Sequence, residues 1–437
     1  MTRDKIRVLL LAEAANPEWA SVPLVGWSHS RAIASLTPAH LVTQVRNRQS
    51  LLRAGLVEGS DFTAVDSELI AKPLSRISLL LRGGPGQGWT TAVVFSTISY
   101  YFFEHLVWKL FEEDLRRGRY DLVHRLTPLS PAMPSLMATR CRRIGVPFVL
   151  GPINGGVPWP KGFDSTRRRE REWLSPVRAA YKLLPGYRST LRDASAIIVG
   201  SRVTWNEIPR VHRAKCYYIP ENAIDSVRFP SWRNRRASRP IKAIFVGRLV
   251  PLKGVDMLIE AAAPLLREGA MTLNIIGDGP QMAHIREFLR MERVEAAVRL
   301  AGWVDHEQVQ KELTEADLFV FPSIREFGGG AVLEAMAAGV MPVVLDYAGP
   351  AELVTKHTGC LIELTTRREI VARLREALSQ LAANPDEIDR KGLAAMHRAR
   401  GLFTWEVKAK QVLKIYRWVL GMESDRPVYP MPVPDVE

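Results

Sequence analysis

The chain has 437 residues, of which 47% are apolar and 24% are charged. These shares exclude a disordered or collagen-like chain, and the length exceeds what one hydrophobic core normally serves, so we expect two compact domains. The net charge of +14 is unevenly spread, because residues 1–240 carry 36 Lys and Arg against 19 Asp and Glu, whereas residues 241–437 carry 24 against 27. The first half therefore suits an anionic partner: a membrane surface, a phosphorylated acceptor or nucleic acid.

The chain starts with an apolar run at residues 8–12 that is too short for a signal peptide and ends at Glu13, so it predicts a first β-strand. Further apolar runs at 40–45, 120–126, 146–151 and 194–201 alternate with helical patterns. Strands that are continuously apolar and alternate with helices predict a parallel sheet covered on both faces. Three distant cysteines, Cys141, Cys216 and Cys360, match no metal-ligand spacing and indicate a reducing, cytoplasmic compartment without disulfide or zinc.

Two segments of the first half raise the question of a membrane. The apolar stretch at residues 91–111 carries Glu104 and His105 at its centre, which favours a buried helix over a segment lying in a membrane face. Residues 159–192 interleave Lys and Arg with Trp, Phe, Tyr and Leu. This second segment is either a solvated helical face or a patch that contacts anionic lipid headgroups or a lipid-phosphate acceptor at the inner face of the cell membrane.

Residues 228–240 lose the apolar periodicity and gain Pro, Ser and Arg, which indicates a linker between domains. After it the alternation resumes, with predicted strands at 242–247, 273–277, 298–302, 317–321 and 342–346 and predicted helices at 255–267, 281–291 and 331–338. The sequence therefore predicts an α/β protein with two doubly wound domains and a cleft between them. In such sheets ligands bind beyond the carboxyl ends of the strands.

Basic residues and glycines follow the first two predicted strands of the second half. Arg248 and Lys253 flank the start of a helix, where two cations and free N–H groups can bind a pyrophosphate; two solvated loop cations are the other interpretation. The order of residues is not that of a Walker A loop. Gly277 and Gly279 lack the third glycine of the dinucleotide fingerprint, so they indicate a tight turn and no nicotinamide cofactor.

The sequence REFGGGAVLEAMAAG at residues 325–339 follows the fourth of these strands. Its glycines allow close approach of backbone to a ligand, and Glu326 and Glu334 lie on either side of the predicted helix start. Two carboxylates that flank an anion site can accept hydrogen bonds from hydroxyls at both ends of one ligand. This pattern fits a sugar nucleotide better than a solvated turn.

The ordered motifs FVGRLVPLKGVDMLIEAA, NIIGDGP, AGWV and ADLFVFPSIREFGGGAVLEAMAAGVMPVV, followed by FTWEVKAKQVLKIYRWVL, resemble the C-terminal half of retaining glycosyltransferases of family four (group 1), which have the GT-B fold. The resemblance covers roughly residues 220–420. It implies a first, acceptor-binding domain at 1–220 with a returning helix at 404–422, a donor-binding domain at 221–403 and a tail at 423–437.

The resemblance also implies a role for each matching residue. Arg248 and Lys253 would hold the departing diphosphate, and Glu326 and His124 would lie at the donor sugar. Leu126 stands where many relatives have a second histidine. His124 therefore has two equally good interpretations, a residue that faces the sugar and a histidine of the core. The implied donor-binding residues are Gly247, Phe327, Gly328, Gly329, Gly330 and Glu334.

We therefore expect a metal-independent, retaining glycosyltransferase of polysaccharide biosynthesis that uses a nucleotide-diphosphate sugar, needs no cofactor and acts on a glycan, glycolipid or lipid-linked acceptor. A nucleotide-sugar epimerase or phosphorylase of the same fold is disfavoured by the paired glutamates. A basic binding protein for membrane or nucleic acid is the alternative from another class, although no nucleic-acid reading element is found.

Overall fold

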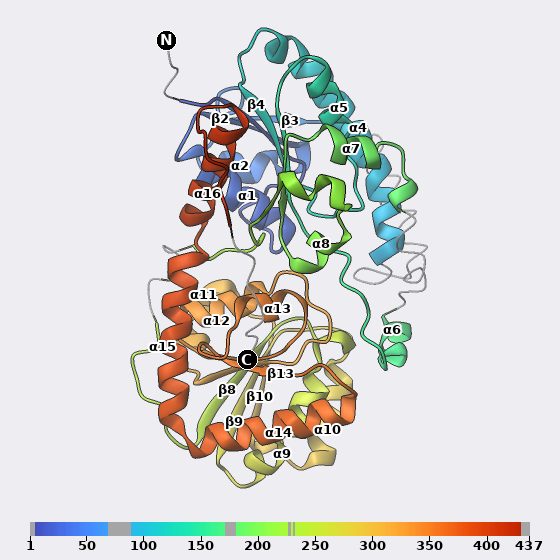
Figure 1. Cartoon of the computed structure of the whole chain (residues 1–437). Coiled ribbons are helices and arrows are strands. Elements are labelled where there is room, and N and C mark those ends of the chain that lie inside the picture. The colour runs from blue at the N-terminus through green and yellow to red at the C-terminus, as the bar shows by residue number, and fades with distance from the viewer. Residues whose placement is uncertain (1–4, 69–88, 171–180, 226–228, 230–231, 430–437) are drawn as a thin grey trace. The chain divides into compact units, whose positions relative to one another are not determined.

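The computed structural model describes residues 5–68, 89–170, 181–225, 229 and 232–429 (Figure 1). They form two compact units. Unit 1 comprises Met1–Gly156, Arg171–Glu221 and Trp405–Met431, and unit 2 comprises Val157–Glu170, Asn222–Thr404 and Pro432–Glu437. The chain passes between the units at residues 221/222 and 404/405, and the segment Val157–Glu170 belongs to unit 2 although both of its flanks belong to unit 1.

Unit 1 contains a seven-stranded parallel sheet with the order β3-β2-β1-β4-β5-β6-β7. Its strands are β1 Val8–Ala12, β2 Ala39–Gln44, β3 Phe62–Val65, β4 Leu122–Thr127, β5 Phe148–Ile153, β6 Ala196–Val199 and β7 Cys216–Tyr218. All five residues of β1 are buried because helices cover both faces of the sheet, which explains the continuous apolar run. The strand order reverses between β1 and β4, where Leu9 pairs with Val123.

The helices of unit 1 are α1 Val22–Ala34, α2 Arg48–Arg53, α4 Trp89–Arg116, α5 Leu136–Arg143, α7 Tyr187–Asp193, α8 Arg202–Glu207 and α16 Trp405–Val419. Along α4, Tyr100, Phe103 and Val107 are buried in the core of the unit, so this stretch is the helix with a buried face that was favoured from its sequence. Helix α16 packs Val412 and Ile415 into the same core as β1. The C-terminal helix therefore returns to the first unit, as predicted.

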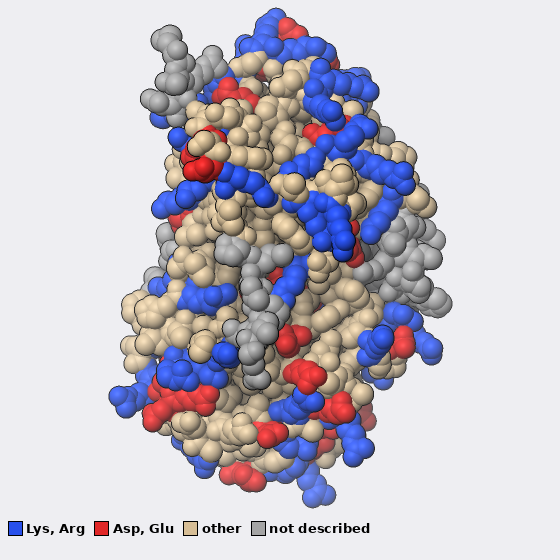
Figure 2. Space-filling model, in the orientation of Figure 1, with Lys and Arg blue, Asp and Glu red and all other residues tan. Residues whose placement is uncertain are grey.

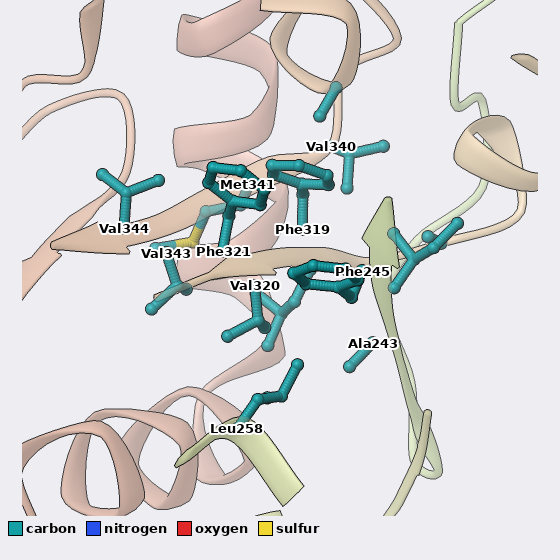
Figure 3. Packing of buried hydrophobic residues seen from close by; sticks show 14 of the residues in the cluster. Ala243, Phe245, Leu258, Phe319, Val320, Phe321, Val340, Met341, Val343 and Val344 are labelled. Carbon is teal, nitrogen blue, oxygen red and sulfur yellow. The ribbon is translucent and has the colours of Figure 1, made fainter. Parts of the chain in front are cut away.

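Unit 2 contains a six-stranded parallel sheet with the order β10-β9-β8-β11-β12-β13. Its strands are β8 Ile241–Val246, β9 Met271–Ile276, β10 Val298–Gly302, β11 Leu318–Phe321, β12 Met341–Leu345 and β13 Cys360–Ile362. Phe245 stacks on Phe321, and Phe321 stacks on Phe319, each pair with ring centroids 5.6 Å apart (Figure 3). These rings fix β8 beside β11, where the strand order reverses.

The helices of unit 2 are α6 Asp164–Arg169, α9 Val255–Arg267, α10 Met282–Glu292, α11 His306–Thr314, α12 Gly330–Ala337, α13 Ala348–Leu353, α14 Arg367–Ala383 and α15 Pro385–Leu402. Helix α9 buries nine of its residues, which accounts for its amphipathic sequence. Helix α14 begins with a capping box made by Thr366 and Glu369. Two doubly wound parallel sheets with helices confirm the predicted α/β class.

The predicted basic segment at 159–192 is divided between the two units. Residues 159–170 belong to unit 2, residues 181–192 belong to unit 1, and 171–180 lie outside the described residues. The buried side chain of Phe163 joins the core of unit 2, which ties the first part of this segment to that unit. On the face drawn in Figure 2, Lys and Arg gather over unit 1, while unit 2 mixes both signs. Within the described ranges no helix has the length and apolarity needed to cross a membrane.

Candidate active site

The first loop of the site follows β8 in unit 2. Gly247 and the exposed Arg248 leave the strand, and a short 3-10 helix, Pro251–Lys253, brings the chain to helix α9. Gly254 lies between the two helices with a φ of 68°, a left-handed conformation that favours glycine. The half-buried Lys253 therefore ends the loop at the amino end of α9.

The second loop follows β11 and ends at helix α12. Gly329 precedes the helix with a φ of 62° and has no side chain that could cap the first-turn N–H groups of α12. Glu326 lies in the loop, and Glu334 lies about one turn inside the helix, where it is half-buried. A helix start of this kind favours an anion.

Backbone contacts join the two loops. The N–H of Ile324 donates to the carbonyl of Leu252 at 3.0 Å, and the hydroxyl of Ser323 donates to the same carbonyl at 3.2 Å. A side chain at Gly254 would place its Cβ 2.5 Å from the carbonyl oxygen of Pro322. The loops after β8 and β11 consequently form one continuous surface at the point where the strand order reverses, which is where doubly wound sheets bind ligands.

An ion pair between Lys253 and Glu326 crosses this junction. The Lys253 ammonium also lies 4.8 Å from the ring centroid of Phe321, and the two charged side chains are only 17% and 19% exposed. A cation and a carboxylate that are largely withdrawn from water interact more strongly than a surface pair. Two predicted site residues from distant parts of the sequence are thus brought together.

Helix α13 packs against the second loop. The N–H of Gly349 donates to the carbonyl of Glu326 at 3.3 Å, and a Cβ at Gly349 would lie 2.1 Å from the carbonyl oxygen of Phe327. At Gly330 an added Cβ would meet the side chain of Asn222 at 3.7 Å. The predicted donor-binding residues Phe327, Gly328 and Gly329 therefore lie on a loop whose backbone is held by packing, and Gly330 begins helix α12.

The two glycines after β9 pack against the first loop. A Cβ at Gly277 would lie 1.9 Å from the carbonyl oxygen of Gly247, and one at Gly279 would lie 2.5 Å from that of Leu249. These glycines permit two turns to touch, in agreement with the tight-turn interpretation of the motif.

The predicted sugar-facing residue His124 lies inside unit 1. Its ring is fully buried on β4, its Nε2 lies 2.6 Å from the carbonyl oxygen of Gly151 and its Nδ1 contacts the hydroxyl of Tyr416 on α16. The Nε2–H donates to the carbonyl and Nδ1 accepts from the tyrosine, so both ring nitrogens are occupied. Burial lowers the pKa of His124 to about 3. These contacts match the core-residue interpretation that was left open.

The sequence reasoning missed two charged groups at strand ends. Arg325, which is 7% exposed, donates from Nε to the carbonyl of Val157 at 3.0 Å. In unit 1, Glu13 follows β1 and pairs with Arg46, and burial raises the pKa of the Glu13 carboxyl. Position after a strand was the available signal for Glu13, whereas the partner of Arg325 is far away in sequence.

Comparison with known proteins identifies the family of the chain. The family model for glycosyl transferases group 1 matches residues 227–391. A GDP-mannose-dependent alpha-mannosyltransferase of Mycobacterium tuberculosis (strain CDC 1551 / Oshkosh) is 33% identical over 319 residues, covering 70% of this chain and 74% of that protein. The chain belongs to the group 1 glycosyltransferase family, which confirms the resemblance seen in its motifs.

Other relatives match over shorter lengths. A glycogen synthase of Mycobacterium tuberculosis (strain CDC 1551 / Oshkosh) is 34% identical over 201 residues, and this chain spans about half of it, since the match covers 47% of that protein and 45% of this chain.

Solved structures share the fold. Sucrose-phosphate synthase from Thermosynechococcus elongatus has a TM-score of 0.61 at 16% identity, covering 96% of this chain and 100% of that one. Anabaena HepE in complex with UDP and glucose has a TM-score of 0.57 at 17% identity, covering 94% and 99%. These likenesses establish the GT-B fold expected from the sequence.

Proposed function

We propose that the chain transfers a sugar from a nucleoside-diphosphate sugar to a glycan, glycolipid or lipid-linked acceptor, with retention of configuration and without a metal ion or cofactor. The observation that carries this proposal is the Lys253–Glu326 ion pair, which joins the loops after β8 and β11 beside the amino end of α12. A cation and the N–H groups of a helix start favour a diphosphate, and a carboxylate can accept hydrogen bonds from the sugar hydroxyls.

Each group has a role in the proposed reaction. A bound diphosphate competes for the Lys253 ammonium, which leaves the Glu326 carboxylate to accept hydrogen bonds from sugar hydroxyls. Arg248 and the first turn of α12 add positive charge where the diphosphate departs, and Glu334 accepts hydrogen bonds from ribose hydroxyls. Charge that is already oriented in the protein stabilises the leaving group without a metal ion.

The named ligands of similar proteins suggest the first donors to test. One relative is named for GDP-mannose, and one structure of the same fold contains UDP and glucose. We therefore propose GDP- and UDP-sugars as donor candidates.

A panel of nucleotide sugars tests the function without knowledge of the acceptor. Mass spectrometry of slow donor hydrolysis reports the sugar nucleotide that is used, and thermal unfolding with GDP or UDP reports nucleotide binding. Release of the nucleoside diphosphate and a matching thermal shift support a transferase. Stabilisation by an oligonucleotide alone, with every sugar nucleotide left intact, would reject it.

We also propose that unit 1 contacts an anionic membrane at the turn before α7. Leu183 is 81% exposed, Lys182 precedes it and Arg188 is exposed on the helix that follows. The hydroxyl of Tyr101 on α4 donates to the carbonyl of Pro185 at 2.6 Å, which anchors this turn. An exposed apolar side chain among cations is typical of a surface that binds anionic lipid.

Co-sedimentation with vesicles tests the membrane proposal. Binding to phosphatidylcholine vesicles that contain phosphatidylglycerol is expected, with a loss in Leu183→Asp. The control Leu393→Asp changes a leucine that is 53% exposed on α15 of unit 2 and should bind as the wild type does. Equal binding by both variants would contradict the proposal.

A further inference from the structure

The segment Val157–Glu170, here called the crossing segment, leaves unit 1 and packs on unit 2 before the chain returns to unit 1. Phe163, at 4% exposure, anchors its middle in the hydrophobic core of unit 2. Its first residues reach the loop after β12, since the hydroxyl of Tyr347 donates to the carbonyl of Pro158 at 2.9 Å. A segment fixed in this way can hold other groups in position.

Arg325 is the main link between the crossing segment and the loop after β11. Its guanidinium lies 5.0 Å from the ring centroid of Trp159 and 5.3 Å from that of Phe327, and its Nε donates to the carbonyl of Val157. A planar guanidinium that stacks on aromatic faces loses little further freedom when it forms a hydrogen bond. The contacts of Arg325 therefore fix the residues on both sides of Glu326.

The far end of the crossing segment contacts the other loop of the site. The carboxylate of Glu170, which is buried, accepts from the N–H of Leu252 at 3.2 Å. Leu252 precedes Lys253, and its carbonyl accepts the hydrogen bonds from Ser323 and Ile324. Both loops that supply the Lys253–Glu326 ion pair are thus in contact with the crossing segment.

We propose that the crossing segment positions the donor site, with Trp159 acting through Arg325 to fix the Glu326 carboxylate at the sugar. Trp159 and Arg325 are positioning residues, since neither is assigned a contact with the donor. The expected effect on the rate of nucleotide-sugar hydrolysis rests on the proposed function. Its physical basis, a loop held by the crossing segment, is a property of the free protein.

Hydrogen exchange in the free protein tests the physical basis. Trp159→Ala is expected to increase amide exchange in a peptide that covers residues 323–330, whereas Trp159→Phe, which keeps an aromatic face, restores the slow exchange. The matched control is Trp232→Ala, because Trp232 also stacks on an arginine of unit 2, Arg400, at 5.1 Å, beside Gly339 at the other end of α12. Unchanged exchange in a folded Trp159→Ala protein would overturn the proposal.

Donor turnover tests the consequence. Trp159→Ala should lower the rate of nucleotide-sugar hydrolysis by about 10- to 100-fold, while the Kd for the nucleoside diphosphate stays within about two-fold, because only the sugar contact is misplaced. Arg325→Lys should act in the same direction, since it keeps the charge and loses the planar stacking. Trp232→Ala should leave both values unchanged.

The outcomes separate the two proposals. Equal losses of nucleotide binding and turnover in Trp159→Ala would show a purely structural role and overturn the positioning role. A wild-type protein that binds and cleaves no sugar nucleotide would instead refute the proposed function. The exchange experiment would still decide whether the crossing segment holds the loop.

Discussion

Lys253 and Glu326 form an ion pair although 73 positions separate them in the chain. The pair exists because β8 and β11 are neighbours in the sheet of unit 2 and their carboxyl ends meet at the same edge. It supplies the first prediction. Lys253→Ala should abolish most of the thermal stabilisation by GDP or UDP, because the diphosphate loses its half-buried cation. Glu326→Gln should retain that stabilisation and lose donor turnover by about 100-fold or more.

The control for these variants is Lys242→Ala. Lys242 lies at the amino end of β8, and its ammonium is 3.8 Å from the carboxylate of Glu315. It has the same charge but is at the wrong end of the strand for a ligand site, so the nucleotide response should be unchanged. If Lys242→Ala reduced the thermal stabilisation by GDP or UDP as much as Lys253→Ala does, the cause would be the change in net charge and not the position of Lys253.

Glu334 provides the second prediction. Glu334→Ala should weaken nucleoside diphosphate binding by about 1–3 kcal/mol, which is roughly 5- to 150-fold in Kd, because ribose hydroxyls lose a charged acceptor. Titration calorimetry measures the effect. Glu307→Ala, which removes a 79% exposed carboxylate on α11, is the control and should bind normally. If Glu334→Ala bound the nucleoside diphosphate with wild-type affinity, the assignment of Glu334 to the ribose hydroxyls would be wrong.

The close approach of the two loops gives the third prediction. Gly254 and Gly269 have the same φ of 68°, but a Cβ at Gly254 would lie 2.5 Å from the Pro322 carbonyl oxygen, whereas nothing lies within 4 Å at Gly269. Gly269→Ala should cost about 1–2 kcal/mol in the free energy of unfolding from the left-handed backbone alone. Gly254→Ala should cost about 1–3 kcal/mol more from overpacking and should also weaken nucleotide binding. Denaturant unfolding measures the difference, and equal costs would contradict the close approach.

The buried histidine of unit 1 gives the fourth prediction. The folded protein holds the pKa of His124 at about 3, below its ordinary value of 6.5. As the pH falls from about 6.5 toward 3, His124 becomes protonated in the unfolded chain but stays neutral in the folded protein. This group therefore lowers the free energy of unfolding by up to about 1.4 kcal/mol for each pH unit of the fall. Above pH 6.5 its stabilising contribution is fully present.

Denaturant unfolding as a function of pH checks this expectation. His124→Gln should flatten the dependence between pH 4 and 6.5 relative to the wild type. His105→Gln changes an exposed histidine on α4 and should leave the slope unaltered. Parallel curves for the wild type and His124→Gln would contradict a neutral buried imidazole.

The sequence predicted the long buried strands and several helices, because their apolar patterns are locally visible, but it did not predict α11, α14 and α15. Helix α9 was expected at the residues where it lies, Val255–Arg267. The short strands Cys216–Tyr218 and Cys360–Ile362 were not predicted, since three residues carry too little periodicity.

Part of the site was visible in the sequence and part was not. Lys253 and Glu326 could be named because both follow predicted strands, and the parallel sheet brings such positions together. The pairing of Arg325 with Trp159 depends on where residues 157–170 pack. Their local composition does not indicate that they belong to unit 2. His124 was ambiguous because a histidine on a buried strand can belong to a core or to a ligand site, and it lies within β4, Leu122–Thr127.

The hydrogen bond between His124 and Tyr416 joins residues that are 292 positions apart. Tyr416, Val412 and Ile415 complete the core around β1, yet a ribosome makes them only after residues Asn222–Thr404, which contain the whole sheet of unit 2. The first unit therefore stays incomplete during synthesis while the second can already fold, which reverses the usual order of folding from the N-terminus. A chain released before residue 405 would present an uncovered apolar face and would be a substrate for chaperones or proteases.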